Sequence, residues 1–284
     1  MIRVGLRDAR AHFSRFLLSI IAIALGVSFV VGSFCFREML NNQVDEMMAT
    51  NADHDVYVRG SEEQHDDETT STDSDSDTST ATYNMIDTSL TTTISKVNGV
   101  KDATADTSVS GVLTLVGKDG NAVSSGMSGV TVAINGKAWR SAHLEHGDWP
   151  KSRHEIALHT FALEQSGLGI GDTTTLVYPS GPEDVKIVGS FSTDSSQAGA
   201  LLIAVPGNVV KDLYEQNSGQ SGQTQNIGVY GSANGGSPLT ASQQQELADR
   251  INKALPRSSK AHAITGDQMR DESSKSSKEM LGFI

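Results

Sequence analysis

The sequence has a single cysteine, Cys35, and few aromatic residues, which make up 5% of its 284 residues. One cysteine allows no disulfide within the chain and no metal site built from several thiolates. The sparse aromatic residues offer no stacking platform for nucleic-acid bases. Basic residues are also in deficit, since 22 Lys and Arg face 34 Asp and Glu and the formal charge is −12. Such an acidic chain repels nucleic acid, so we expect no nucleic-acid partner.

The usual catalytic motifs are missing as well. Gly136-Lys137 lacks the neighbours of a phosphate-binding loop, and no Gly-x-Ser-x-Gly elbow is present. His154 and His159 enclose an HExxxH pattern. A spacing of five residues directs the two rings about 140° apart on a helix and to opposite faces of a strand, so they do not share a metal. We therefore expect no catalytic residues, no metal and no cofactor in this chain.

A long uncharged run lies near the N-terminus. Phe16–Phe36 comprises 21 residues without a charge, and a helix of that length spans the roughly 30 Å hydrocarbon core of a bilayer. Four arginines precede the run and one follows it, so the positive-inside rule places the N-terminus in the cytoplasm and the acidic bulk outside. The alternative is a cleaved signal peptide. Its apolar core is normally about 7–15 residues long and followed by a small-x-small site, whereas this run ends in Phe-Cys-Phe.

Residues 1–15 are predicted to form a cytoplasmic amphipathic helix. Apolar residues recur there at helical spacing, and arginines follow them one position round the helix. The simpler interpretation is a topology signal that binds membrane lipid headgroups. The functional interpretation is a docking helix, in which Arg3, Leu6, Arg7 and Arg10 contact a cytoplasmic partner.

Stalk helices are predicted on both sides of the outer domain. The helical pattern of the span continues through 37–52 without glycine or proline. At the other end, 262–284 is polar and compatible with a helix before it turns apolar. We expect this second stalk helix to lead into a further membrane span that lies beyond Ile284.

Residues 53–261 are expected to form the domain outside the cytoplasm. Within it, 61–82 holds eight acidic residues and no basic ones, which predicts a disordered acidic loop. Strands are predicted at 56–59, 109–116, 130–134, 155–158, 173–178, 185–191, 201–205 and 227–230. Helices are predicted over 86–97, 208–216 and 242–255, the last with a Ser242/Gln245 capping box. Runs of strands with few helices predict an α+β fold with two sub-domains, one of them built on the strands of 155–191.

The order of these features resembles the MacB/FtsX-type ABC transporter permeases and their MacB-like periplasmic core domain. The resemblance rests on a basic N-terminus, one span, a stalk, a D-V-Y-V strand and a spaced sequence motif that recurs in the family and consists mainly of glycines, acidic residues and a few apolar residues. That motif is filled here by Gly147, Pro150, Glu155, Ala162, Gly167, Gly171, Asp172, Val188 and Gly189. We interpret Glu155, Gly171, Asp172 and Gly189 as a structural motif, because Gly171-Asp172 suits a tight turn that enters a strand.

The resemblance implies a non-catalytic permease subunit in the cell membrane. Its expected partners are a cytoplasmic ABC ATPase subunit, membrane lipid and a second permease copy or half. ATP hydrolysis by the partner is expected to move the stalk helices and the outer domain, either for export or for mechanotransmission to an extracellular peptide, lipoprotein or protein. The alternative is a single-span surface adhesion or sensor module that has no ATPase partner.

Overall fold

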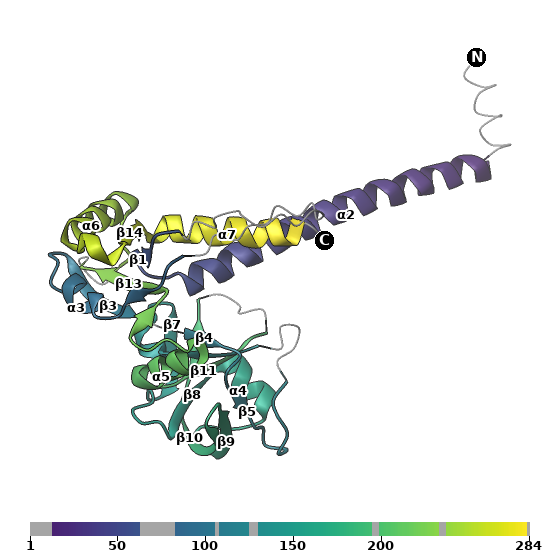
Figure 1. The fold of residues 1–284 in the computed structure, drawn as a ribbon. Coiled ribbons are helices and arrows are strands. Elements are labelled where there is room, and N and C mark those ends of the chain that lie inside the picture. The colour runs from purple at the N-terminus through teal and green to yellow at the C-terminus, as the bar shows by residue number, and fades with distance from the viewer. Residues whose placement is uncertain are drawn as a thin grey trace, which may run out of the picture. The chain divides into compact units, whose positions relative to one another are not determined.

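The computed structural model describes residues 13–62, 83–105, 108–124, 130–194, 199–232 and 237–282 (Figure 1). The predicted contact residues Arg3, Leu6, Arg7 and Arg10 lie outside these ranges, as do residues 63–82 of the predicted acidic loop. The ends of that loop are joined, because Glu62 and Tyr83 form an antiparallel bridge. The chain divides after Asp45 into two compact units.

The first described element is α2, a helix of 39 residues over Phe13–Asn51. Its segment Leu17–Met39 has a mean hydropathy of 2.4 with none of it buried. This segment is long and apolar enough to cross a membrane. The helix runs without a break through the predicted span at 16–36 and ends one residue before the predicted stalk does.

A four-stranded antiparallel sheet follows α2, with the strand order β14-β1-β13-β3. Its strands are β1 (Val56–Gly60), β3 (Val100–Ala105), β13 (Asn226–Gly231) and β14 (Ala261–Thr265). Two helices, α3 (Leu90–Ile94) and α6 (Ala241–Ala254), supply the apolar side chains that pack on it. Val56 and Val58 lie in this core, whereas Arg59 points away from it and pairs with Glu272. Strand β1 is therefore buried on both faces.

The second large sheet is mixed and has eight strands. Its strand order is β4-β6-β11-β8-β10-β9-β5, and β7 pairs with β10. Its strands are β4 (Ser108–Ser110), β5 (Thr114–Leu115), β6 (Thr131–Ile134), β7 (Ala142–Gly147), β8 (Glu155–His159), β9 (Thr173–Tyr178), β10 (Gly181–Thr193) and β11 (Leu201–Ala204). The pairs β8/β10 and β6/β11 are parallel, and the other pairs are antiparallel.

Both faces of the eight-stranded sheet are covered. Helices α4 (Thr160–Ser166) and α5 (Gly207–Ser218) contribute to the larger core on one face. Trp139 and Phe191 belong to a smaller core on the other face. Because successive side chains of a strand alternate between faces, Leu201 and Ile203 enter the larger core while Leu202 enters the smaller one. The four-stranded and eight-stranded sheets, each packed on core residues of its own, confirm the predicted α+β fold with two sub-domains.

The last described helix, α7 (Gly266–Gly282), starts directly after β14. Strand β14 lies at the edge of its sheet, and the Asn252 side chain covers the open side. Asn252 Nδ2 donates to the Ala263 carbonyl at 3.1 Å, and Asn252 Oδ1 accepts from the Ala263 amide at 2.7 Å. An amide side chain here takes the place of a neighbouring strand, which protects an edge that is otherwise open to pairing.

Three details of the predicted secondary structure are wrong. A helix is predicted over 86–97, but Ile86–Asp87 form strand β2, which pairs with β12 (Gln223–Thr224). Within 86–97, α-helix is confined to α3. The predicted strand 109–116 is two strands, separated at Gly111, whose φ of +73° favours glycine. The capping box of α6 uses Thr240 and Gln243 rather than Ser242 and Gln245. In the first case, pairing with a distant strand overrides a local helical spacing.

Candidate functional site

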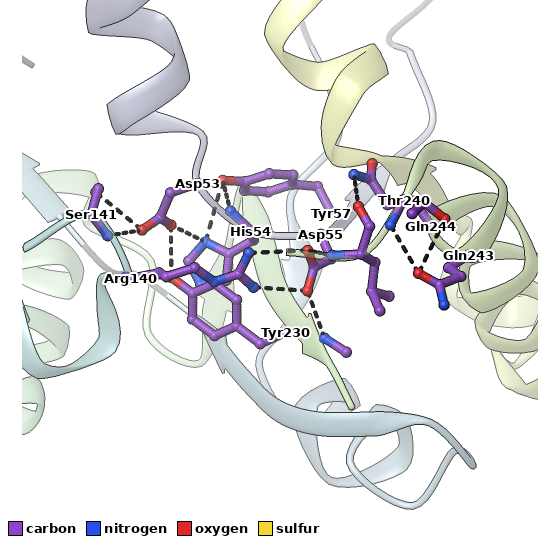
Figure 2. Close-up of polar contacts among 12 residues, drawn as sticks. Asp53, His54, Asp55, Tyr57, Arg140, Ser141, Tyr230, Thr240, Gln243 and Gln244 are labelled. Carbon is purple, nitrogen blue, oxygen red and sulfur yellow. Dashed lines mark hydrogen bonds and ion pairs between the residues drawn. The ribbon is translucent and has the colours of Figure 1, made fainter. Parts of the chain in front are cut away.

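Three polar residues, Asp53, His54 and Asp55, connect the end of α2 to the start of β1. Their side chains are 8%, 3% and 1% exposed, respectively. Burial of charged groups is costly unless each finds a partner. Figure 2 shows these partners around the segment, and they come from several elements that are distant in the sequence. We call Asp53, His54, Asp55, Arg140, Ser141 and Tyr230 the junction cluster.

Asp55 has four hydrogen-bond donors around its carboxylate. Arg140 donates through both terminal nitrogens, with Nη1 at 3.1 Å from Oδ1 and Nη2 at 2.8 Å from Oδ2. The backbone amides of Gly231 and Leu239 donate at 2.9 and 3.0 Å. A bidentate guanidinium with two amides satisfies the lone pairs of a carboxylate. Asp55 thereby links β1, the end of β13, the entry to α6 and the segment before β7.

Asp53 supplies the second carboxylate of the junction cluster and binds the same segment before β7. Its Oδ2 accepts from the Ser141 amide at 2.9 Å and from the Ser141 hydroxyl at 3.1 Å. Its Oδ1 accepts from the Tyr230 hydroxyl at 2.7 Å. Burial raises the pKa of Asp53, but the His54 ring and the donors from Ser141 and Tyr230 outweigh it and leave the pKa below its usual value. The group is therefore a carboxylate at neutral pH.

Aromatic rings fill the space between the two carboxylates. The His54 ring stacks on Tyr230 with 4.0 Å between centroids, and the Arg140 guanidinium lies 4.4 Å from the Tyr230 centroid. The Tyr230 hydroxyl also accepts from the Arg140 amide at 2.9 Å. Burial and the charge of Asp53 raise the pKa of Tyr230, so its hydroxyl stays protonated and remains a donor. His54 Nε2 is buried without a hydrogen-bond partner among the described residues.

The junction cluster joins the two sheets. Asp53 and Asp55 precede β1 of the four-stranded sheet, and Tyr230 belongs to β13 of the same sheet. Arg140 and Ser141 lie just before β7 of the eight-stranded sheet, after a short 3-10 helix at Gly136–Ala138. The side chains of Asp53 and Asp55 therefore hydrogen-bond to residues from both sheets or from the segments that enter them.

The start of α7 is fastened to the same region. Arg270 Nη1 donates at 2.8 Å to the carbonyl of Ala52, the residue that follows α2. Arg59 of β1 binds Glu272 through both terminal nitrogens at 2.6 and 3.1 Å. Gln244 is 4% exposed, and its side chain accepts from the Asp267 amide at 3.2 Å and donates to the Leu239 carbonyl at 3.1 Å. These contacts tie the first turns of α7 to β1, α6 and the end of α2.

Comparison with known proteins decides the family. The family model described as MacB-like periplasmic core domain matches residues 16–261. The chain belongs to this family. The resemblance to MacB/FtsX-type permeases is thus confirmed, and the family consists of permease-type components of ABC transporters.

Two solved structures are similar to the MacB-like chain. The periplasmic region of MacB from Actinobacillus actinomycetemcomitans shares 15% identity, with 77% of this chain and 91% of that one covered at a TM-score of 0.48. A domain of a proposed permease protein from Porphyromonas gingivalis shares 13% identity, with 74% and 86% covered at a TM-score of 0.44. The search of curated proteins found no match.

The predicted structural motif of the MacB-like domain lies in the eight-stranded sheet. Glu155 Oε2 accepts the amides of Lys151 and Ser152 at 2.8 and 3.2 Å. Gly171 has a φ of +97°, and Asp172 Oδ2 accepts the Gly169 amide at 2.9 Å. These contacts fix turns at the starts of β8 and β9.

Gly189 allows β10 to lie close to the end of its paired strand β7. A Cβ atom at this position would lie 2.4 Å from the Asp148 carbonyl oxygen, so any larger residue has to push β7 away from β10. His154 and His159 stand at opposite ends of β8. His159 Nδ1 accepts from the Phe161 amide at 3.2 Å and so caps α4.

Sequence reasoning assigns no role to the junction cluster of the MacB-like domain. Asp55 is part of the D-V-Y-V phrase, but its partner Arg140 is 85 residues away and Leu239 is 184 residues away. The sequence offers one local indication of the cluster: Asp53 and Asp55 stand between a long apolar helix and an apolar strand, where side chains are expected to be buried. Such a signal marks Asp53 and Asp55 as paired groups without naming their partners.

Proposed function

We propose that this chain is the permease subunit of a MacB/FtsX-type ABC transporter and carries movement driven by a separate cytoplasmic ATPase to its extracytoplasmic domain. The observation that supports this most directly is the register of two strands. Val56, the first residue of β1, pairs with Thr265, the last residue of β14. Helix α2 leads into β1 and α7 leaves β14, so both helices attach at one end of a single strand pair.

The junction cluster supports transmission beyond this strand pair. Asp55 and Arg140 form a bidentate ion pair whose carboxylate is 1% exposed. Breaking a buried pair by removing one partner costs about 3–5 kcal/mol, far more than breaking an exposed one. When the segment after α2 shifts, the Asp55–Arg140 pair therefore moves the eight-stranded sheet with it, because breaking the pair is costly.

The orientation follows from charge. Four arginines precede the apolar stretch and one follows it, which favours a cytoplasmic N-terminus and an extracytoplasmic acidic domain. In this arrangement Arg3, Leu6, Arg7 and Arg10 face the cytoplasm and contact the ATPase. ATP hydrolysis belongs to that partner, and a second permease copy or half completes the transporter. The outer domain acts on an extracellular peptide, lipoprotein or protein, by export or by mechanotransmission.

Co-purification tests this proposal. The intact chain is expressed with an ABC ATPase encoded beside its gene, extracted in detergent and captured through a C-terminal tag. We expect the ATPase in the eluate, identified by mass spectrometry and ATP hydrolysis. Leu6→Asp combined with Arg7→Glu is expected to reduce its recovery at least about tenfold, because the change removes apolar and cationic contacts together.

A matched pair of substitutions on the outer domain serves as the control. Leu144→Asp with Lys151→Glu makes the same chemical changes at two exposed positions and is expected to leave recovery unchanged. Absence of any ATPase from the intact chain's eluate favours the stand-alone adhesion or sensor module and contradicts the permease.

A further inference from the structure

A pocket of about 250 Å³ lies beside the junction cluster. Its lining comes from the start of β3, from the segment before β7 and from the end of β13, and it includes Lys101, Asp102, Lys137, Trp139, Arg140 and Tyr230. Two of these residues, Arg140 and Tyr230, are members of the junction cluster. A group bound in the pocket therefore touches the contacts that join the two sheets.

The charge of the lining is opposite to that of the chain. The protein carries −12, yet the pocket has three cationic side chains and one acidic one. Arg140 is already paired with Asp55, and Asp102 accepts from the Thr104 hydroxyl at 3.2 Å. Lys101 and Lys137 are exposed and form no ion pair with the part of the chain that the structure describes. The ammonium groups of Lys101 and Lys137 are therefore available to bind an anion in the pocket.

Size and apolar content narrow the class of anion. The volume is below the roughly 300–1,000 Å³ of sites for drug-sized ligands and suits a single side chain. Trp139 is 6% exposed in this wall, and the Tyr230 ring is half-buried beside it. The Arg140 guanidinium, which is the geometry preferred for phosphate, already holds Asp55 in a bidentate pair. A carboxylate on a short apolar side chain fits this pocket, because the carboxylate can pair with the two lysine ammonium groups while the apolar part contacts the Trp139 and Tyr230 rings.

We infer that the pocket binds an acidic side chain of an extracytoplasmic peptide or protein partner. The inference rests on the proposed function for placing the pocket outside the cytoplasm and for the movement of α2 and α7. The incoming carboxylate pairs with Lys101 and Lys137 and lies beside Arg140, whose guanidinium holds Asp55. Partner binding and the junction cluster are then linked, and because such coupling is reciprocal, movement of α2 and α7 changes the affinity for the partner.

A fluorescence titration of the full chain in detergent tests the inference without an ATPase. Trp149→Phe leaves Trp139 as the single tryptophan, since the chain has two. The probe is the hexapeptide Gly-Ser-Glu-Glu-Ser-Gly with both ends blocked, and its comparison is the Gln-Gln version. We expect a saturable change in Trp139 emission with the Glu peptide, weakened by added salt, and none with the Gln peptide.

Two lysine variants complete the design. Lys101→Ala with Lys137→Ala is expected to weaken binding about three- to tenfold, which is the size expected for two exposed charge contacts. Lys96→Ala with Lys118→Ala removes two exposed lysines elsewhere and is expected to change nothing. The inference is overturned if the Gln peptide binds equally, if the Lys101/Lys137 variant binds like the parent, or if inorganic phosphate produces the same emission change. The lysine variants replace exposed side chains and Trp149→Phe replaces a partly buried one, so unchanged circular dichroism checks the folding of each protein.

Discussion

Asp55 is the most deeply buried carboxylate of the junction cluster. Four donors surround a carboxylate that is 1% exposed. Asp55→Ala leaves the Arg140 guanidinium and two backbone amides without their acceptor. We expect the free energy of unfolding to fall by about 3–5 kcal/mol, measured by denaturant titration of the full chain in detergent with near-ultraviolet circular dichroism.

A second bidentate ion pair provides the control for this change. Arg153 binds Glu183 through Nε and Nη2, but the two side chains are 30% and 25% exposed. Glu183→Ala is expected to cost about 1 kcal/mol or less, since solvent screens the pair. Equal losses for Asp55→Ala and Glu183→Ala would show that burial of the junction cluster adds nothing to its strength.

At the residue scale the sequence predicts local turns but not long-range partners. Short turns such as Gly171-Asp172 can be read locally, because Asp172 accepts the Gly169 amide through its side chain and donates its own amide to the Gly169 carbonyl, three positions away. The contacts of Asp53 to Tyr230 and of Asp55 to Leu239 join residues 177 and 184 positions apart. No spacing rule reaches over such distances, so these contacts require the folded chain.

At the scale of elements, β14 depends on a side chain from α6. Asn252 provides both hydrogen bonds to the outer side of Ala263. Asn252→Ala removes them, and we expect β14 to open more readily by about 1–2 kcal/mol. Hydrogen exchange followed by mass spectrometry on peptides that contain Ala261–Thr265 is expected to be roughly tenfold faster.

The control for β14 lies on the same helix. Gln245 donates to Asp249 within α6 and has no hydrogen bond to the sheet among the described residues. Gln245→Ala is expected to leave exchange in Ala261–Thr265 unchanged. Slow exchange in the Asn252→Ala protein would mean that the edge of β14 is protected by something other than this side chain.

Elements could be predicted from the sequence where local pattern and burial agree. The apolar run of α2 and the alternating strand β9 are examples, and both occur as expected. Strand β7 is not predictable in this way, because Ala142–Gly147 is polar and largely exposed and is held by pairing with β10. Ile86 shows the opposite case, since its helical spacing is overridden by pairing with Thr224.

At the scale of the whole molecule, family membership and two sub-domains follow from ordered features that the sequence displays: a basic start, an apolar helix and an acidic α+β domain. The route that we propose for movement through this domain comes from the structure alone. It depends on the Val56–Thr265 register and on the junction cluster. Together they connect two helices that are far apart in the sequence to both sheets.

The central claim is that ATP-driven movement of the helices reaches the eight-stranded sheet through the junction cluster. It is tested most directly by a spin-label distance between Ser276→Cys on α7 and Gln165→Cys on α4, with Cys35→Ser, in the transporter assembled with its ATPase. Both labelled positions are exposed. We predict that ATP shifts the distance distribution in the parent protein and that Arg140→Met, which removes the partner of Asp55, reduces the shift. Identical distributions with and without ATP, or an undiminished shift in the Arg140→Met protein, would contradict the account.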